Sequence, residues 1–441
     1  MDTAALDRVG EQLDTFVGEV FSSLARKDQR EKAGLYSRGL MLDGRRKSMQ
    51  PMAQRLQVDH QQLQQFVTTS PWDVTPVRKT LSRRACGLID PDAWVIDDTG
   101  FIKDGPASPG VARQYSGTLG KVGNCQIAVS VHAATDAASA PLDWRLFLPE
   151  SWDDRSTADP ETVAAITARR RRSAIPDTEH HRPKWQMAIE MIDELTEWGR
   201  IPPVVVADAG YGDTTAFRLA LTERGIDYVV AVKGATSAHP GDAVPETAAY
   251  TGRLRPSTPR YGPHTTCKDL VLAAGRKSLR TVTWRRGSKT DPTNPTASMR
   301  SRFAVLRVRP ANRDIPRAED GTLPAVWLLA EWPTGAGEPT DYWLSTLPAD
   351  TPLPELVRLA KIRWRVEHDY RELKTGLGLD HFEGRSWLGW HHHATRILPF
   401  PAFSTGVPGI PVRGGIGQPV GSPACDWLLR GGLRSKPAQS P

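Results

Sequence analysis

Three carboxylates in three different contexts carry the chemistry that this sequence suggests. Asp97 and Asp98 end the apolar run AWVIDD, and Asp208 ends the apolar run PPVVVAD. Glu367 lies in IRWRVEHDYRELK, which has helical periodicity. Because strand ends in mixed α/β sheets meet at one edge, we expect the two strand-end positions to lie together. Gathered carboxylates repel one another unless a cation compensates, and their hard oxygens suit Mg²⁺ or Mn²⁺. Two such ions would activate a water or 3′-hydroxyl for phosphodiester cleavage or transfer.

Each acid taken alone has an ordinary explanation as a strand-end or surface residue. The joint pattern is more specific, because DDTG and DAGYG both follow apolar runs and both supply a glycine for a tight turn. The sequence therefore favours a shared acidic site over unrelated surface acids.

The segment around Glu367 adds two cations. In one continuous helix, with Glu367 mid-helix, Arg363 and Lys374 share its face, while Val366 and Tyr370 lie on a separate apolar stripe. A carboxylate beside two cations suits a metal ligand next to a phosphate backbone. An ordinary surface ion pair between residues four apart is the alternative, and the spacing does not decide between them.

The elements that must position these residues follow from the apolar patterns. Strands are expected at about 93–97, 125–133 and 142–148, followed by helix, strand, helix and strand, an order that predicts an α/β fold with a mixed sheet, such as a ribonuclease-H-like core. Strands are also expected in DLVLAAG, SLRTVTW, RFAVLRVRP, AVWLLAEW and DYWLSTL. The predicted units are a helical DNA-binding domain (1–90), the first part of the catalytic core (91–240), an antiparallel β insertion (241–350), a core helix carrying Glu367 (351–395) and a Pro/Gly-rich tail (396–441).

Composition sets the class of protein. The net charge of +7 and pI near 9.3 favour a nucleic-acid partner, and the residues between 26 and 55 are especially rich in Lys and Arg. A solvated helix surface is the alternative for that basic stretch. The four cysteines are scattered and no long uncharged apolar run occurs, so we expect a cytoplasmic protein, nucleoid-associated when bound to DNA, without disulfides or a membrane span.

The segment IRWRVEHDYRELK resembles the signature of bacterial insertion-sequence transposases of the DDE class, in the branch with the pattern Y-x2-R-x3-E-x6-K. Arg363, Glu367 and Lys374 fall on its R, E and K, whereas Ala360 stands at the Tyr position. WVIDDTGFIKDG, ARQYSGTLGKVGNCQ, VVADAGYGD and GLDHFEGRSWLGWHHH resemble the same family, so the similarity runs from about residue 35 to 393.

The resemblance implies a cut-and-paste DNA transposase with Asp98, Asp208 and Glu367 as ligands of Mg²⁺ or Mn²⁺, and we expect two ions. A gapless match to I-acid-D-T favours Asp98, a D-x-T pattern favours Asp97, and we prefer Asp98. The implied partners are double-stranded DNA (terminal inverted repeats and target) and a second copy, in a homodimeric synaptic complex. The expected DNA contacts are Arg363, Lys374, Arg371, Arg45, Arg46, Lys47 and Trp332, the last stacking on a flipped base unless it is a core aromatic.

Two features near the C-terminus bear on whether this copy is active. His391, His392 and His393 are adjacent, so they cannot chelate one ion well, and we expect a helix segment or a solvated surface. After them the chain turns Pro- and Gly-rich, and we interpret this as a reading-frame change near residues 394–397 that removes a final packing helix. That hypothesis predicts a destabilised or inactive copy, with a remnant that only binds repeat DNA as the alternative to an active transposase.

Overall fold

The computed structural model describes residues 3–42, 44, 46–117, 119–247, 259–286 and 298–397. Arg45 and the tail beyond Ile397, on which two of the expectations above fall, lie outside the described residues.

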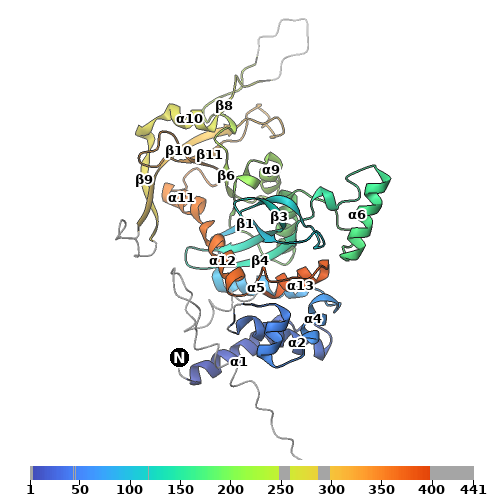
Figure 1. Cartoon of the computed structure of the whole chain (residues 1–441). Helices are drawn as coiled ribbons and strands as arrows, with labels where there is room; N and C mark the ends of the chain where they lie inside the picture. Colours follow the sequence, from blue (N-terminus) through green and yellow to red (C-terminus); the bar gives the residue numbers. More distant parts are fainter. Residues whose placement is uncertain are drawn as a thin grey trace, which may run out of the picture.

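Helices come first, as the apolar periodicity predicts. They are α1 (Thr3–Val20), α2 (Lys27–Met41), α3 (Met49–Leu56), α4 (His60–Thr68) and α5 (Thr75–Ile89). Leu13 and Phe16 of α1 are buried, as expected for one apolar stripe. The Asp59 carboxylate accepts a hydrogen bond from Gln61 N and so caps α4. These helices form one end of an elongated molecule (Figure 1).

A single mixed sheet forms the centre. Its strands are β1 (Ala93–Ile102), β2 (Ala112–Ser116), β3 (Lys121–Ala134), β4 (Ser139–Leu146), β5 (Val205–Ala207), β6 (Tyr228–Val232), β7 (Ser237–Pro240), β8 (Thr265–Thr266), β9 (Arg280–Arg286), β10 (Ser298–Pro310), β11 (Val326–Glu331) and β12 (Asp341–Ser345). Their order is β2-β3-β1-β5-β6-β12-β11-β10-β7-β8, with β4 also beside β3 and β9 beside β10. The β1–β5 and β5–β6 pairs are parallel, and the other pairs are antiparallel. An α/β fold with a mixed sheet is therefore confirmed.

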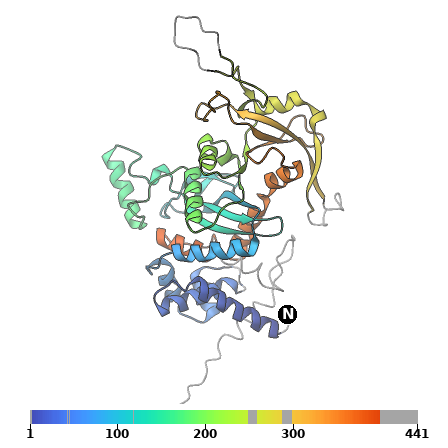
Figure 2. The ribbon, with the colours of Figure 1, turned by 180° about the vertical axis from the view of Figure 1, so that it is seen from behind.

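Helices cover both faces of this sheet. Val95 of β1 packs in the core under α11 (Leu353–Lys361) and α12 (Trp364–Thr375), which we call the α12 face. Trp94 and Ile96 pack in the core under α7 (Lys184–Glu197) and α9 (Thr215–Glu223), which we call the α7 face. From behind, α5 lies between the sheet and the other N-terminal helices (Figure 2). The remaining helical elements are α6 (Pro160–Arg172), α8 (Ala209–Gly212), α10 (Cys267–Ala274), α13 (Trp387–Ile397) and the short 3₁₀ turns at Glu150–Trp152 and Arg276–Ser278.

Two of the sequence predictions are wrong in their local detail. DLVLAAG belongs to helix α10 rather than to a strand, because the Thr266 hydroxyl accepts from Asp269 N and caps the helix. The segment expected as one helix is two, since α11 ends at Lys361 and α12 begins at Trp364. Glu367 consequently lies in the first turn of α12 and not mid-helix.

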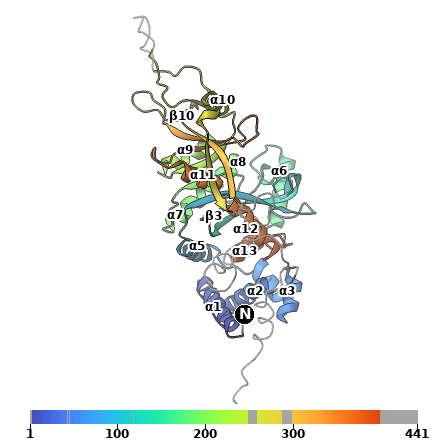
Figure 3. The ribbon, with the colours of Figure 1, turned by 90° about the vertical axis from the view of Figure 1, so that its left-hand side faces the viewer.

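Helix α13, the last of the described helices, packs against the N-terminal helices. It follows α11 and α12 down one side of the molecule and reaches the N-terminal helices (Figure 3). His392 stacks on Trp72, with ring centroids 3.8 Å apart, and the Tyr36 hydroxyl is 2.8 Å from Nδ1 of His393. Both histidines are buried, so the expectation of a solvated surface is wrong, whereas that of a helix is confirmed. None of the described helices is long and apolar enough to cross a membrane.

Candidate active site

The register of the two central parallel strands brings Asp97 beside Asp208. Ile96 of β1 pairs with Ala207 of β5, so the next residue of each strand continues the register. Val95 and Val206 both pack on the α12 face, and side chains two residues apart along a strand share a face. The backbone at Asp208 is still extended, and its carboxylate accepts a hydrogen bond from Gly210 N. Asp97 and Asp208 therefore lie side by side on the α12 face.

Asp98 belongs to the opposite face. It follows Ile96, which packs on the α7 face, and its Oδ2 is 2.9 Å from the Lys184 ammonium at the start of α7. It remains close enough to Asp208 to raise the pKa of that acid. The arrangement around α12 therefore involves Asp97, and the sequence preference for Asp98 gives way to Asp97 in the proposal made below.

The break between α11 and α12 places the Arg363 guanidinium against Asp97. Arg363 is the residue just before α12, and its Nη1 donates to Asp97 Oδ2 at 2.9 Å. Its Nη2 lies 2.9 Å from Oε1 of Glu367. A single guanidinium thus bridges Asp97, in the middle of β1, and Glu367 of α12. The pair between Arg363 and Glu367 is part of this bridge rather than an isolated surface ion pair.

Burial makes these acids unusual. Asp97 is only 7% exposed, and burial raises the pKa of its carboxyl to about 7, against the lowering effect of Arg363 and with a further rise from Asp208. Burial also raises the pKa of Asp208. The side chain of Glu367 is 58% exposed at the rim. A buried carboxylate, a partly buried neighbour and an exposed third one are a donor set that a divalent cation would stabilise.

Lys374 closes the other side of the site. Its ammonium donates to Thr99 Oγ1 and to the carbonyl of Gly100, both at 2.8 Å. Burial lowers the pKa of this lysine to about 8. Arg371, on the same helix, is exposed.

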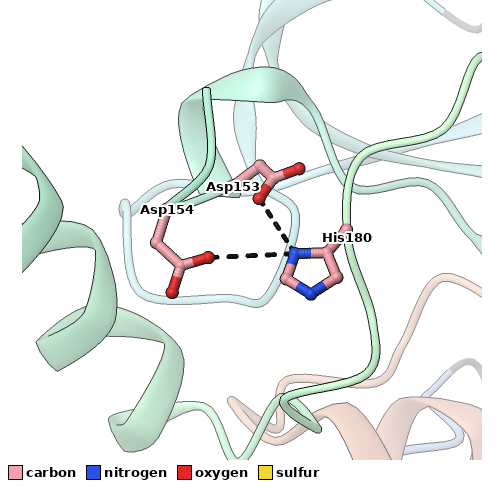
Figure 4. Close-up of side chains that lie close together, drawn as sticks. All are labelled: Asp153, Asp154 and His180. Carbon is pink, nitrogen blue, oxygen red and sulfur yellow. Dashed lines mark hydrogen bonds and ion pairs between the residues drawn. The ribbon is translucent and has the colours of Figure 1, made fainter. Parts of the chain in front are cut away.

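A separate cluster satisfies simple distance criteria for a metal site. Among the described residues, only one group of three His, Cys, Asp or Glu side chains has all its ligand atoms within 4.8 Å of one another. It consists of Asp153, Asp154 and His180 (Figure 4). Asp153 already accepts from His180 Nδ1 at 3.0 Å and from the backbone N–H groups of Arg155 and His181. Although burial opposes it, these hydrogen bonds hold the pKa of Asp153 below its ordinary value. We interpret the cluster as a structural ion pair.

The carboxylate oxygens of Asp97, Asp208 and Glu367 do not all lie within the same 4.8 Å of one another in this structure. The Arg363 guanidinium, a cation itself, stands between two of them.

The structure removes two of the expected DNA contacts. Lys47 is 5% exposed, and its ammonium donates to the Leu42 carbonyl, so it faces the protein interior. Trp332 is 4% exposed, donates to the Ala336 carbonyl and packs under Arg276, as a core aromatic does. Arg46, in contrast, is well exposed and lies 3.5 Å from Glu383.

Sequence reasoning missed two residues at this edge of the sheet. Lys184 pairs with Asp98 from a helix whose position only the fold reveals. Tyr211 of α8 is fully buried, its hydroxyl has no hydrogen-bond partner among the described residues, and burial and then Asp98 raise its pKa. The available signal for Tyr211 was its place in DAGYGD, directly after a strand-end acid.

The chain belongs to the DDE superfamily of endonucleases. Residues 19–291 match the family model described as DDE superfamily endonuclease, a segment that includes Asp97, Asp98 and Asp208 but ends before Glu367. The chain is also 29% identical over 199 residues to a protein of Microchaete diplosiphon described as "Probable transposase for insertion sequence element IS701". That match covers 44% of this chain and 47% of the relative, so the chain spans about half the length of the curated relative that it matches.

Proposed function

We propose that this protein is an insertion-sequence transposase that cleaves DNA at the terminal inverted repeats of its element and joins the ends to target DNA. The observation that carries the proposal is the in-register pair Asp97 and Asp208 on the face where Arg363 links Asp97 to Glu367. The membership in an endonuclease superfamily and the similarity to a probable transposase support it. The mixed sheet is that of a ribonuclease-H-like core in this proposal.

Asp97, Asp208 and Glu367 are the proposed holders of one or two Mg²⁺ or Mn²⁺ ions. When bound, such an ion activates the attacking water or 3′-hydroxyl and stabilises the leaving oxygen. The fit rests on the donor set, because one buried and one partly buried carboxylate of raised pKa favour the charged state only beside a cation. In the metal-free protein Arg363 provides part of that compensation.

The cations of α12 are the proposed phosphate contacts. Arg363 is able to offer its planar fork to a phosphate once it leaves the carboxylates, and bidentate recognition is what guanidinium groups do well. Lys374 holds the strand bearing Asp97 and adds positive charge beside it. Arg371 is exposed on the same helix and extends this basic edge.

The proposed partners are DNA and a second copy of the chain. The N-terminal helices would bind the repeats, with Arg46 as an exposed phosphate contact. Residues 241–350 form the proposed β insertion, although their strands extend the same sheet through the pairing of β12 with β6. Bringing two element ends together requires at least a dimer on DNA.

Paired substitutions test the function and the choice of acid. In Mg²⁺, on a donor plasmid carrying the native element ends, Asp97→Asn is expected to lower the cleavage rate by at least about 100-fold, because a lost metal ligand costs several kcal/mol in the transition state. Asp98→Asn, which removes only a partner of Lys184, is expected to stay within about tenfold of the unchanged protein.

The outcomes separate the alternatives. Full activity of both variants would refute a carboxylate-based nuclease at this site. Loss only in Asp98→Asn would reverse the assignment of Asp97. An unchanged protein that binds the repeats but never cuts them would support the remnant that only binds DNA.

A further inference from the structure

A chain of buried polar side chains connects α12 to strand β3 directly beneath the acids. Its members are Ser130 and His132 of β3 and Asp369 and Tyr370 of α12, and each is at most 8% exposed. Ser130 is also the β-sheet partner of Asp97. The chain therefore joins the strand next to Asp97 to the helix that carries Glu367.

The hydrogen bonds of this chain allow one consistent direction, in which Nδ1 of His132 carries the ring proton. Asp369 accepts from His132 Nδ1 at 3.1 Å and from the Ser139 hydroxyl at 2.7 Å. With its proton on Nδ1, His132 accepts at Nε2 from the Ser130 hydroxyl at 3.0 Å. Ser130 in turn accepts from the Tyr370 hydroxyl at 2.7 Å. Every member is satisfied, which is the condition under which a buried polar network fixes one arrangement.

These residue types also occur in nucleophilic hydrolases, but that use does not fit here. Ser130 and His132 are both 0% exposed, so no substrate reaches the hydroxyl. The serine hydroxyl also lies 3.4 Å from the Asp97 carbonyl, on the inner side of the sheet. The network is almost entirely shielded from solvent, and its contacts lead to the backbone of Asp97.

We propose that His132, Asp369 and Tyr370 are positioning residues, which hold the first turn of α12 against β1 so that Glu367 and Asp97 face one cation site. This inference rests on the proposed function, because it assigns the network a role in holding the metal ligands. Directional hydrogen bonds fix both the distance and the rotation of a helix, whereas apolar contacts alone allow it to slide. Two of the three residues lie within three positions of Glu367, so a rotation of α12 would move its carboxylate directly.

Mn²⁺ binding to the full chain, measured by calorimetry without DNA, tests the inference. Tyr370→Phe leaves Ser130 without its donor, and Asp369→Asn removes the negative charge and leaves one acceptor oxygen where His132 and Ser139 now have two. Each is expected to weaken Mn²⁺ binding by about tenfold, the effect typical of outer partners of metal ligands. Because Asp369→Asn conserves shape, it also serves if Tyr370→Phe folds poorly.

The matched control is Tyr36→Phe. It also removes one hydrogen bond of a buried tyrosine hydroxyl, here the bond of Tyr36 with Nδ1 of His393, which involves none of the acids. It should lower the melting temperature about as much as Tyr370→Phe, yet leave Mn²⁺ affinity unchanged.

Asp208→Asn serves as the reference that separates the two claims. If it weakens Mn²⁺ binding while Tyr370→Phe and Asp369→Asn match Tyr36→Phe, the positioning role is refuted and the proposed function stands. If Asp208→Asn itself leaves Mn²⁺ binding unchanged, the metal site of the proposed function is refuted and the positioning role falls with it.

Discussion

Asp97 combines two properties that conflict in the absence of a cation. It is almost fully buried and it lies beside Asp208, so ionisation costs both desolvation and repulsion. Arg363 offsets part of this cost through a 2.9 Å hydrogen bond, but the same guanidinium also serves Glu367. A bound divalent cation would offset both costs, and this is the physical reason for proposing Asp97 as a metal ligand.

The raised pKa of Asp97 predicts how stability depends on pH. Its pKa is about 7 in the folded protein, against 3.8 for an aspartate in the unfolded chain, so folding favours the protonated form of this carboxyl. The stability that this group contributes is fully present below about pH 3.8 and is lost as the pH rises through about 7. Asp97→Asn has no such loss. In EDTA, the melting temperature of this variant minus that of the unchanged protein should therefore increase from pH 4 to pH 7.

The comparison of thermal melts checks this directly. Asp98→Asn is the control, because that acid is partly exposed and paired with Lys184. If the difference in melting temperature between Asp97→Asn and the unchanged protein stays constant across that pH range, Asp97 has an ordinary pKa and the prediction is contradicted.

The residue types of the site could be predicted from the sequence, but their directions could not. The pattern of apolar runs ending in acids predicts Asp97, Asp98 and Asp208 as strand-end residues. Asp208 does follow the end of β5, but the prediction is wrong for Asp97 and Asp98, because β1 continues to Ile102. Which of two adjacent aspartates faces α12 depends on the register of β1 with β5, a long-range pairing that no local pattern records. Lys47 was misassigned for a similar reason, because the packing that buries it involves distant segments.

At the scale of elements, the break before α12 determines the geometry of the site. The apolar periodicity runs unbroken from Leu353 to Leu373, so the sequence predicted one helix there. The structure interrupts it at Ile362 and Arg363, which turns Arg363 towards Asp97 and leaves Glu367 in the first turn of the new helix. An acid in the first turn is favoured by the helix dipole, so this location costs little.

Helix α13 provides a test of how the ends of the chain are joined. Arg396 is 0% exposed, and its guanidinium lies over the rings of Tyr36, Phe66 and Trp72. Its Nε and Nη1 have no hydrogen-bond partner among the described residues, and burial lowers its pKa to about 9. A buried charge without an acid partner is costly.

Arg396→Met should therefore leave the free energy of unfolding unchanged or raise it by about 1 kcal/mol, since an apolar chain of similar length fills the same space. Arg396→Ala should lower it by about 2–4 kcal/mol through the cavity it creates. Urea denaturation measures both. Equal destabilisation by Met and Ala would mean that the charge, and not the volume, holds α13 in place.

At the scale of the whole molecule, the N-terminal helices and the central sheet occupy separate regions. The N-terminal helices and strand β1, which carries Asp97, lie in different parts of an elongated structure. Helices α5 and α13 lie between them (Figures 1 and 3). The order of strands and helices was largely predictable, because apolar periodicity is a local signal. The extension of the central sheet by β12, β11 and β10 was not, because strand order depends on long-range pairing.

Arg46 gives a prediction for the DNA contacts of the N-terminal helices. Its side chain is 72% exposed, and its partner Glu383 is equally open to solvent. Arg46→Ala should weaken binding to repeat and unrelated duplexes alike, and it should reduce the slope of log affinity against log salt by about one.

Binding measured at several salt concentrations, for example by fluorescence anisotropy, provides that slope. Arg313→Ala, which removes an even more exposed arginine in the loop after β10, is the control and should leave the slope unchanged. A uniform effect of both substitutions would contradict a specific role of the N-terminal segment.

The central claim is that Asp97, Asp208 and Glu367 together hold a divalent cation. A crystal of the full chain soaked in Mn²⁺, with anomalous diffraction data, tests it most directly. We predict an anomalous peak bounded by these three carboxylates, with the Arg363 guanidinium withdrawn from its bridge between Asp97 and Glu367. A peak only at Asp153, Asp154 and His180, or one bound by Asp98 on the α7 face, would contradict the account.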